Sequence, residues 1–546
     1  MRMGSFFGFN IARSGLFASQ RALNVTAHNV ANANTEGYSR QRLNVVQSTP
    51  LSLPQGQGMI GSGVDTAGIE QIRDEFLDFK IRQEMTTNGE WEARAEALKH
   101  IEAIFNEPSE SGIRKVMDEF FASLHELSKN PDNLTARAEV RQRGIALTET
   151  LNHMYTQLQN LQANTDFAIE TTVNQINGYA QQIASLNEQI YKYELDGNKA
   201  NDLRDQRNLL IDKLSELVNI DVYEAPIPGS NNLSKISITI NGDVLVSHTK
   251  YNQIKMERRT ELNNYCDAPN LLNLKWENEE PLRVSSGKLK GLLDMRDNIS
   301  GSEKGIPYYM DKLNRFTTVF AARFNMQHGK GYGLSGAGNH NQFFNGPVFD
   351  FAKFPENGFE ELKDLNDVKG ASDEDTINNF EEKNPNKTIF KIKDSLGNDH
   401  WYIADIIKAD EISISKDIED LNKIAAAKYD DGSGNGLAGD GSNAEALIEL
   451  RHDVDMFTWG SPEDFFKSAI SNLGVDANEA VRMSENQKVL IQQIDNKRKS
   501  ISGVSLDEEM TNMVKFQHSY NANARMITAI DEMLDRIING MGHVGR

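Results

Sequence analysis

The sequence predicts an α+β protein of several domains: a terminal α-helical coiled coil, a helical-bundle domain, and β-rich or mixed outer domains inserted in the middle of the chain. Three observations support this fold class. The chain has 546 residues, too many for one compact core, since a domain typically holds about 150 residues. Apolar residues recur at steps of three and four at both chain ends, as on one face of a helix. Near Ile220 the period changes to two, as in a strand.

The first element is expected to be a helix with an apolar stripe in a seven-residue rhythm. Four large apolar residues define this stripe: Phe9, Leu16, Leu23 and Val30. The helix should end in the asparagine-rich turn at residues 28–38, because Asn and Gly adopt positive φ at low cost. Extended chain, interrupted by glycines, is expected from there to about residue 72.

The last element is expected to be a helical rod from Val504 to Ile538, roughly 50 Å long. Such a rod cannot bury its apolar stripe alone. Pairing the two terminal rods within one chain would close a monomer, whereas packing them against other subunits would build a larger tube. For the second alternative we predict one assembly seam, made of Phe9, Leu16, Leu23, Val30, Leu506, Met510, Met513, Tyr520, Ile527, Leu534 and Ile538.

Between the rods, the pattern is first helical, then alternating, then mixed. Residues 74–219 predict helices, and Asn241-Gly242 between alternating apolar residues predicts a two-residue β-hairpin. Helical sequence returns at Ser461, with a break near Ser502-Gly503. The expected domains are residues 1–60 with 500–546 (coiled-coil core), 61–220 with 290–344 and 461–499 (helical bundle), 221–289 (β-rich outer domain) and 345–460 (variable acidic α/β outer region).

The net charge is −21, which argues against a protein built to coat nucleic acid, because phosphate neutralisation needs a basic face. The excess is concentrated in residues 351–460, with 12 basic and 25 acidic side chains. An acidic stretch of this kind is usually a solvated surface.

The sequence contains few features that indicate the cellular compartment of the protein. The single cysteine, Cys266, excludes an intrachain disulfide and a four-thiolate metal site. No run of eighteen apolar residues predicts a membrane span. The first ten residues lack the continuous apolar segment of a conventional secretory signal. We therefore expect a protein that stays inside the cell or leaves by a route that does not cleave it.

A search for catalytic motifs predicts no catalytic residue, no cofactor and no metal. His125-Glu126 begins like a zinc-protease helix, but Lys129 stands where the second histidine is required. Residues 56–61 have GxGxxG spacing without the flanking strand and helix of a dinucleotide site. Residues 431–442 place oxygen ligands at calcium-loop positions, but Ser442 replaces the required glutamate. A surface turn is the favoured interpretation of the last segment.

Several stretches resemble a known family. The segments 14–23 and 28–41 resemble the N-terminal signature of bacterial flagellar axial proteins, the family of rod, hook and hook-filament junction proteins. The residues 183–207, 287–344 and 502–520 are similar to the junction members in particular. Residues 345–440 match little of the family pattern. The family motif carried over to this chain comprises Asn29, Asn32, Asn34, Thr35, Gly37 and Tyr38.

The resemblance implies a structural subunit of the extracellular bacterial flagellum and no enzyme. It would be exported by the flagellar type III apparatus without a cleaved signal and would form a homo-oligomeric ring between hook and filament, serving motility. The implied partners are the flagellar hook protein below, a second junction protein (hook-associated protein 3) above, and a cytoplasmic export chaperone on the C-terminal helix. Before assembly, residues 1–60 and 505–546 should be mobile.

Two other hypotheses remain at this point. The first is an axial scaffold that carries an adhesive or calcium-binding outer domain, suggested by the acidic glycine-rich turns. The second is an unrelated cytoplasmic coiled-coil scaffold, which would explain the apolar stripes but not the ordered motifs.

Overall fold

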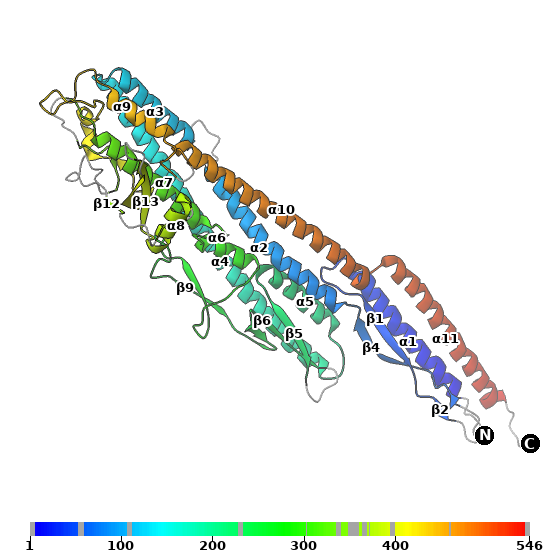
Figure 1. Ribbon diagram of the computed structural model, residues 1–546. Helices are drawn as coiled ribbons and strands as arrows, with labels where there is room; N and C mark the ends of the chain where they lie inside the picture. Colours follow the sequence, from blue (N-terminus) through cyan, green and yellow to red (C-terminus); the bar gives the residue numbers. More distant parts are fainter. Residues whose placement is uncertain are drawn as a thin grey trace, which may run out of the picture.

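The computed structural model describes residues 6–540 except 53–58, 106–111, 228–232, 302, 335–339, 348–359, 363–367, 371, 394–398 and 458–459. The molecule is long and narrow, with helices along most of its length and both chain termini at the same end (Figure 1). Long helices stand at both ends of the chain, and the strands of several small sheets lie between them. This arrangement confirms the predicted α+β class.

Two helices and a β-ribbon form the end that carries the termini, and we call this unit the terminal rod (Figure 1). The ribbon pairs β1 with β4 in antiparallel register, with a bulge between Asn44 and Val45, and β2 pairs with β3. α1 and α11 lie side by side along the rod. The elements are α1 (Phe6–Ala31), β1 (Gln41–Gln47), β2 (Leu51–Ser52), β3 (Met59–Ile60), β4 (Val64–Gln71) and α11 (Leu506–Gly540).

A helical bundle forms the body of the molecule. α2 and α10 run antiparallel beside each other, and Lys488 of α10 forms an ion pair with Glu92 of α2 at 2.8 Å. α10 begins where predicted, because the Ser461 side chain and Asp464 form a capping box. No described helix has the length and apolarity needed to cross a membrane. The helices are α2 (Glu75–Phe105), α3 (Ile113–Lys129), α4 (Leu134–Glu194), α5 (Asn201–Leu217), α6 (Lys288–Asp297), α7 (Ile306–Gly329), α9 (Ser442–Glu449) and α10 (Pro462–Ser502).

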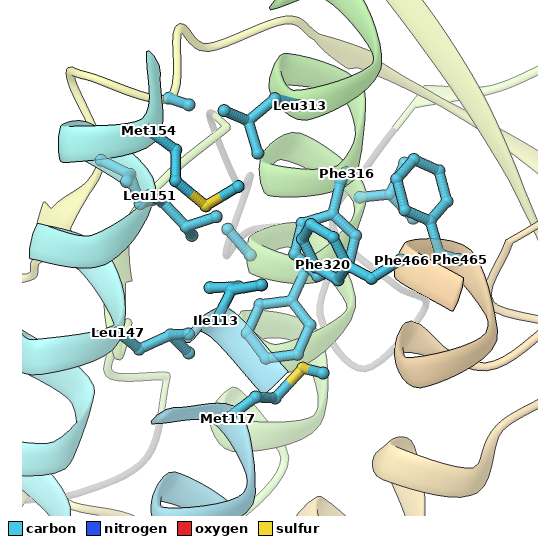
Figure 2. Packing of buried hydrophobic residues seen from close by; sticks show 14 of the residues in the cluster. Ile113, Met117, Leu147, Leu151, Met154, Leu313, Phe316, Phe320, Phe465 and Phe466 are labelled. Atoms are coloured by element: carbon cyan, nitrogen blue, oxygen red, sulfur yellow. The ribbon is translucent and has the colours of Figure 1, made fainter. Parts of the chain in front are cut away.

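The larger hydrophobic core lies in the half of the bundle farther from the terminal rod, where α3, α4, α7 and α10 meet. Figure 2 shows its side chains pointing toward one another from these four helices. The ring of Phe316 in α7 lies 4.5 Å from the ring of Phe466 in α10 and 5.7 Å from that of Phe320, measured between centroids. Each fully buried side chain of this size contributes about 1.5–3 kcal/mol. This core therefore fixes the relative positions of the long helices.

A second core joins α4 to a four-stranded antiparallel sheet of order β5-β6-β7-β8. Within the region that the sequence predicts to be helical, one face of α4 packs there, and its Ile176 and Ile183 are completely buried. The predicted hairpin is confirmed, since Asn241 and Gly242 have φ of 50° and 95°, as a tight two-residue turn requires. The strands are β5 (Asp221–Pro226), β6 (Ser234–Ile240), β7 (Asp243–Ser247), β8 (Lys250–Tyr251), β9 (Ile254–Arg258) and β10 (Leu272–Trp276), the last two forming their own pair.

The acidic region contains both helices and strands and lies beside α7. Its small sheet has the order β12-β14-β13, and α8 packs on β13. Val368, Phe380, Ile389 and Trp401 form its own small core. The elements are β11 (Phe344–Asn345), β12 (Glu360–Glu361), α8 (Asp373–Lys383), β13 (Lys387–Lys393), β14 (Asp399–Asp405), β15 (Ser413–Ile414), and the short 3₁₀ helices η3 (Lys416–Glu419), η4 (Leu421–Lys423) and η5 (Leu450–His452).

Candidate assembly site

The two terminal helices pack antiparallel along their whole contact. Ser19 of α1 donates a hydrogen bond to Ser519 of α11 at 3.2 Å. Toward the start of α1, Gly8 faces Ile530, and toward its end Asn29 faces Glu509. These three contacts show that α1 and α11 are antiparallel and keep one register along their contact.

In α1, the large seam residues Phe9, Leu16, Leu23 and Val30 are all half-buried. The fully buried positions between them hold small side chains, such as Ala12 and Ala22. α1 is covered on two sides, because the β-ribbon also contacts it: the Val64 amide donates to Ser14 Oγ at 3.2 Å. A helix enclosed in this way needs small residues where two neighbours approach, while its larger residues reach the edges of the contact.

In α11, the predicted seam residues divide into two groups. Met513, Tyr520, Ile527 and Leu534 are half-buried on the side that faces α1. The other three, in contrast, are largely exposed, by 53%, 55% and 73%: Leu506, Met510 and Ile538. The most buried residues of α11 are Glu509 and Ile530, which the heptad pattern did not select.

The exposed apolar residues of α11 form two flanks. The first flank, in the N-terminal half, contains Leu506, Met510 and Val514 at steps of four. The second flank, in the C-terminal half, contains Met526, Met533 and Ile537. With 3.6 residues per turn, Met510 and Met533 point in directions about 140° apart around the helix. α11 therefore keeps apolar surface on both sides of its contact with α1.

Two residues of the family motif, Asn29 and Tyr38, form a polar centre at the end of α1, in which Asn29 is almost completely buried. Asn29 uses all of its hydrogen-bonding groups: its Nδ2 donates to the Gln41 carbonyl at 2.8 Å and to Glu509 Oε2 at 3.1 Å. Its Oδ1 accepts from the Gln41 amide at 3.0 Å and from the Tyr38 hydroxyl at 2.8 Å. Asn29 thus pairs with the backbone of Gln41 as a neighbouring strand would, and it fixes where β1 begins.

Arg40 completes this centre with charge. Its Nε donates to Glu509 Oε1 at 2.8 Å, and its Nη1 donates to Glu508 Oε2 at 2.6 Å. Burial raises the pKa of Tyr38, and the nearby carboxylates of Asp202, Asp205 and Glu509 raise it further. The phenol therefore stays protonated as the donor to Asn29.

The remaining motif residues shape the turn. Asn32 Nδ2 donates to the His28 carbonyl at 3.1 Å, and its Oδ1 accepts from Thr35 Oγ1 at 3.2 Å. Gly37 has a φ of +78°, and a Cβ there would lie 3.0 Å from the Leu209 side chain of α5. Only glycine fits this position without strain. Asn34 is exposed.

Three residues of this centre, Arg40, Gln41 and Glu509, are absent from the predicted site. Glu509 stands among three consecutive acidic residues in the first turn of α11, a common helix start, so nothing local marks it as buried. The one available signal was Ser39-Arg40-Gln41, which directly follows the Gly37-Tyr38 pair in the family-like segment.

The structure places the other candidate motifs in ordinary roles. Lys129 pairs with Glu126 at 2.9 Å on an exposed helix face. Asp431 Oδ1 accepts from the Ser433 amide at 2.8 Å, so this carboxylate organises its own turn. Residues 56–58 of the GxGxxG segment lie outside the described residues.

Three acidic side chains in the bundle form ion pairs with one arginine of the same chain. They are Glu90, Asp294 and Glu303, and the arginine is Arg94. Arg94 Nη2 lies 3.0 Å from Glu90, 2.9 Å from Asp294 and 2.7 Å from Glu303. The guanidinium neutralises the position that a metal ion would otherwise take.

Comparison with known proteins matches three family descriptions along the chain. Residues 98–344 match the flagellar hook-associated protein FlgK helical domain. Residues 9–38 match the flagella basal body rod protein family, and residues 500–540 match the C-terminal domain of flagellar basal body rod FlgEFG proteins. The match over residues 9–38 covers most of α1 and the motif that follows it. The match over residues 500–540 covers α11.

Curated relatives match over nearly the full chain. Flagellar hook-associated protein 1 of Bacillus subtilis is 33% identical, covering 99% of both chains. Its counterpart in Escherichia coli is 27% identical, covering 97% of this chain and 99% of the relative. A solved structure, the flagellar hook junction protein FlgK from Burkholderia pseudomallei, has a TM-score of 0.57 at 16% identity, covering 78% of this chain and 100% of that chain. The last comparison supports the fold.

Proposed function

The chain belongs to the family of flagellar hook-associated protein 1, and from this premise we propose that the terminal rod is the part that joins it to neighbouring subunits. The family is structural: its members form the junction between hook and filament of the bacterial flagellum. This chain is accordingly a structural component of the flagellum, and we assign it no catalytic role.

The observation that carries the proposal is the apolar surface that α11 keeps after it has packed on α1. All six residues of the two flanks are about half exposed or more. Contiguous exposed apolar side chains on a helix mark a surface that another protein covers. A second copy would bring apolar flanks of the same kind, and each would bury the other.

Introducing a charge on each flank tests this proposal. Met510→Asp and Met533→Asp each place a carboxylate in a contact that would be dry in the assembly. We expect both variants to fold as monomers and to fail to enter the flagellum, as measured by immunoblotting of sheared appendages. Thr511→Asp, at an exposed polar position of the same helix, is the matched control. Normal incorporation of both methionine variants would refute the proposal.

The neighbours follow from the family position. We propose contact with the flagellar hook protein on one side and with hook-associated protein 3 on the other, and a cytoplasmic export chaperone on α11 before assembly. The exposed flanks of α11 support the chaperone contact, because an unassembled subunit would otherwise carry this apolar surface through the cytoplasm. Export without a cleaved signal belongs to the same proposal.

The predicted domain division is also part of this proposal. Residues 1–60 with 500–546 would form the assembling core, and residues 221–289 and 345–460 would face solvent as outer domains. The mobility of both chain ends before assembly stays a prediction; in the structure α1 and α11 are packed on each other and joined by the Asn29–Glu509 hydrogen bond.

A further inference from the structure

The boundary between the terminal rod and the bundle is polar. Among the described residues, the members of all three hydrophobic clusters fall between residues 91 and 480. None of these clusters therefore spans the boundary. Replacing one such hydrogen bond by hydrogen bonds to water costs about 0.5–1.5 kcal/mol. The rigidity of this boundary therefore depends on whether all of its hydrogen bonds are formed.

Arg40 is the point where three parts of the chain meet. Its amide donates to the Ser502 carbonyl at the end of α10, at 2.8 Å, and its carbonyl accepts from the Ile72 amide at 2.8 Å. Its side chain binds Glu509 and Glu508 in the first turn of α11. One residue therefore links the β-ribbon, the bundle and the last helix.

Gln41 extends the link to α5. Its backbone is held by Asn29 on both sides, and its side chain Nε2 donates to Asp202 Oδ1 at 2.7 Å. The Asn201 side chain donates to Gln41 Oε1 at 3.3 Å and to the Ile69 carbonyl at 3.0 Å. The start of β1 is thus attached to α1 by its backbone and to the bundle by its side chain.

The links through Asn29 and Arg40 depend on α11. When α11 is packed on α1, Glu509 binds Asn29 and Arg40 together and is almost fully buried. When α11 is not packed there, Arg40 loses both carboxylates and Asn29 loses one of its four partners. The boundary then keeps its hydrogen bonds with α5, with α10 and with the segment that follows β4, which water can replace.

We propose that Asn29, Arg40 and Glu509 form a latch that fixes the angle between the terminal rod and the bundle only while α11 is packed on α1. The latch is a property of the single chain, so it goes beyond the proposed assembly and does not require it. Docking of the last helix and orientation of the rod are one event in this mechanism.

Distance measurement by electron spin resonance on the full-length protein tests the latch. Spin labels on Gln20→Cys in α1 and Glu96→Cys in α2, both exposed positions, report the angle of the rod. The native Cys266 is completely buried, and burial raises the pKa of its thiol, so it should stay unlabelled. The single-cysteine parent treated with the label checks this.

The decisive comparison is Glu509→Ala against Glu508→Ala. Both residues bind Arg40 in the same helical turn, but Glu508 is exposed and Glu509 is buried. We expect Glu509→Ala to broaden the distance distribution at least twofold and Glu508→Ala to leave it unchanged. If Glu509→Ala keeps the narrow parental distribution, the latch is refuted.

A second variant is needed if Glu509→Ala abolishes the packing of α11 on α1. Arg40→Gln lies in neither helix and removes the cation while leaving the Asn29–Glu509 hydrogen bond possible. It should broaden the distribution while circular dichroism keeps the parental helix content. A narrow distribution in Arg40→Gln would overturn the proposal. Either result is separate from incorporation into the flagellum, since it is measured on the isolated chain.

Discussion

Asn29 in the first helix donates a hydrogen bond to Glu509 in the last helix across 3.1 Å, although 480 positions separate them in the sequence. Both side chains are almost completely buried, with 1% and 2% of their surface exposed. A buried amide and a buried carboxylate require partners, because each unsatisfied group costs about 1–3 kcal/mol. The two ends of the chain therefore fold as one unit at this point.

Asn29→Ala should destabilise the terminal rod by about 2–4 kcal/mol, because the Gln41 amide and carbonyl, Tyr38 and Glu509 all lose a buried partner. Amide hydrogen exchange of α1 and α11 measures this change, expected as a loss of protection of about a hundredfold or more. Asn34→Ala, at the exposed position of the same motif, should stay within about 0.5 kcal/mol. Equal protection in the two variants would contradict the role assigned to Asn29.

Phe466→Ala should lower the stability of the bundle by about 3–5 kcal/mol, since it opens a cavity beside Phe316 and Phe465. The shift of the urea unfolding midpoint, followed by circular dichroism, gives this value. Phe167→Ala removes the same side chain from a position that is 67% exposed and should cost less than about 1 kcal/mol. Similar midpoints for the two variants would exclude the core shown in Figure 2 as the main source of bundle stability.

His328 should make the fold sensitive to acid. Its Nδ1 contacts the Asn341 carbonyl at 2.8 Å and its Nε2 accepts from the Ala425 amide at 2.9 Å, an arrangement that only the neutral ring satisfies. Burial lowers its pKa from 6.5 to about 4. The unfolded chain therefore binds the proton first, and stability present above pH 6.5 is lost as the pH falls toward 4, by about 3 kcal/mol in total.

The test compares unfolding temperatures between pH 7 and pH 4 for the parent and His328→Gln. Glutamine can make both hydrogen bonds without titrating, so the variant should lose less stability on acidification than the parent. His125→Gln, at an exposed position, should follow the parental curve. Parallel curves for the parent and His328→Gln would show that His328 is not responsible.

Calcium should leave the acidic outer region unchanged. Asp431 accepts hydrogen bonds from the backbone of its own turn, and these bonds lower its pKa. Asp440 likewise accepts from the Lys428 amide at 2.8 Å and the Ser442 amide at 3.0 Å. Isothermal titration with millimolar calcium should give no binding heat, with magnesium as the control ion. A saturable heat that Asp431→Asn abolishes would instead support the calcium-binding alternative.

Elements with local signals could be predicted from the sequence. The turn at Asn241-Gly242 and the capping box at Ser461 each depend on residues only a few positions apart, and both elements form where the sequence indicated. The helical character of residues 74–219 could be predicted in the same way, because the period of a helix such as α4 is contained in one element.

The polar centre of the terminal rod could be predicted only in part. Asn29 and Tyr38 stood out through the family motif, but Glu509 meets them only when α1 and α11 adopt one antiparallel register. The heptad pattern also gives positions around a helix to limited accuracy, so Leu506 and Met510 fall beside the α1 contact rather than in it. A pattern within one helix does not contain the position of its partner.

The two flanks of α11 have a consequence for symmetry. They differ in height along the helix and point in directions about 140° apart, so one two-fold contact, in which a patch meets the same patch of a second copy, would cover only one of them. Contact between the first flank of one molecule and the second flank of the next leaves an unused flank at each end. Growth of that kind is directional and stops only when the series closes on itself, as in a ring, or meets a different protein.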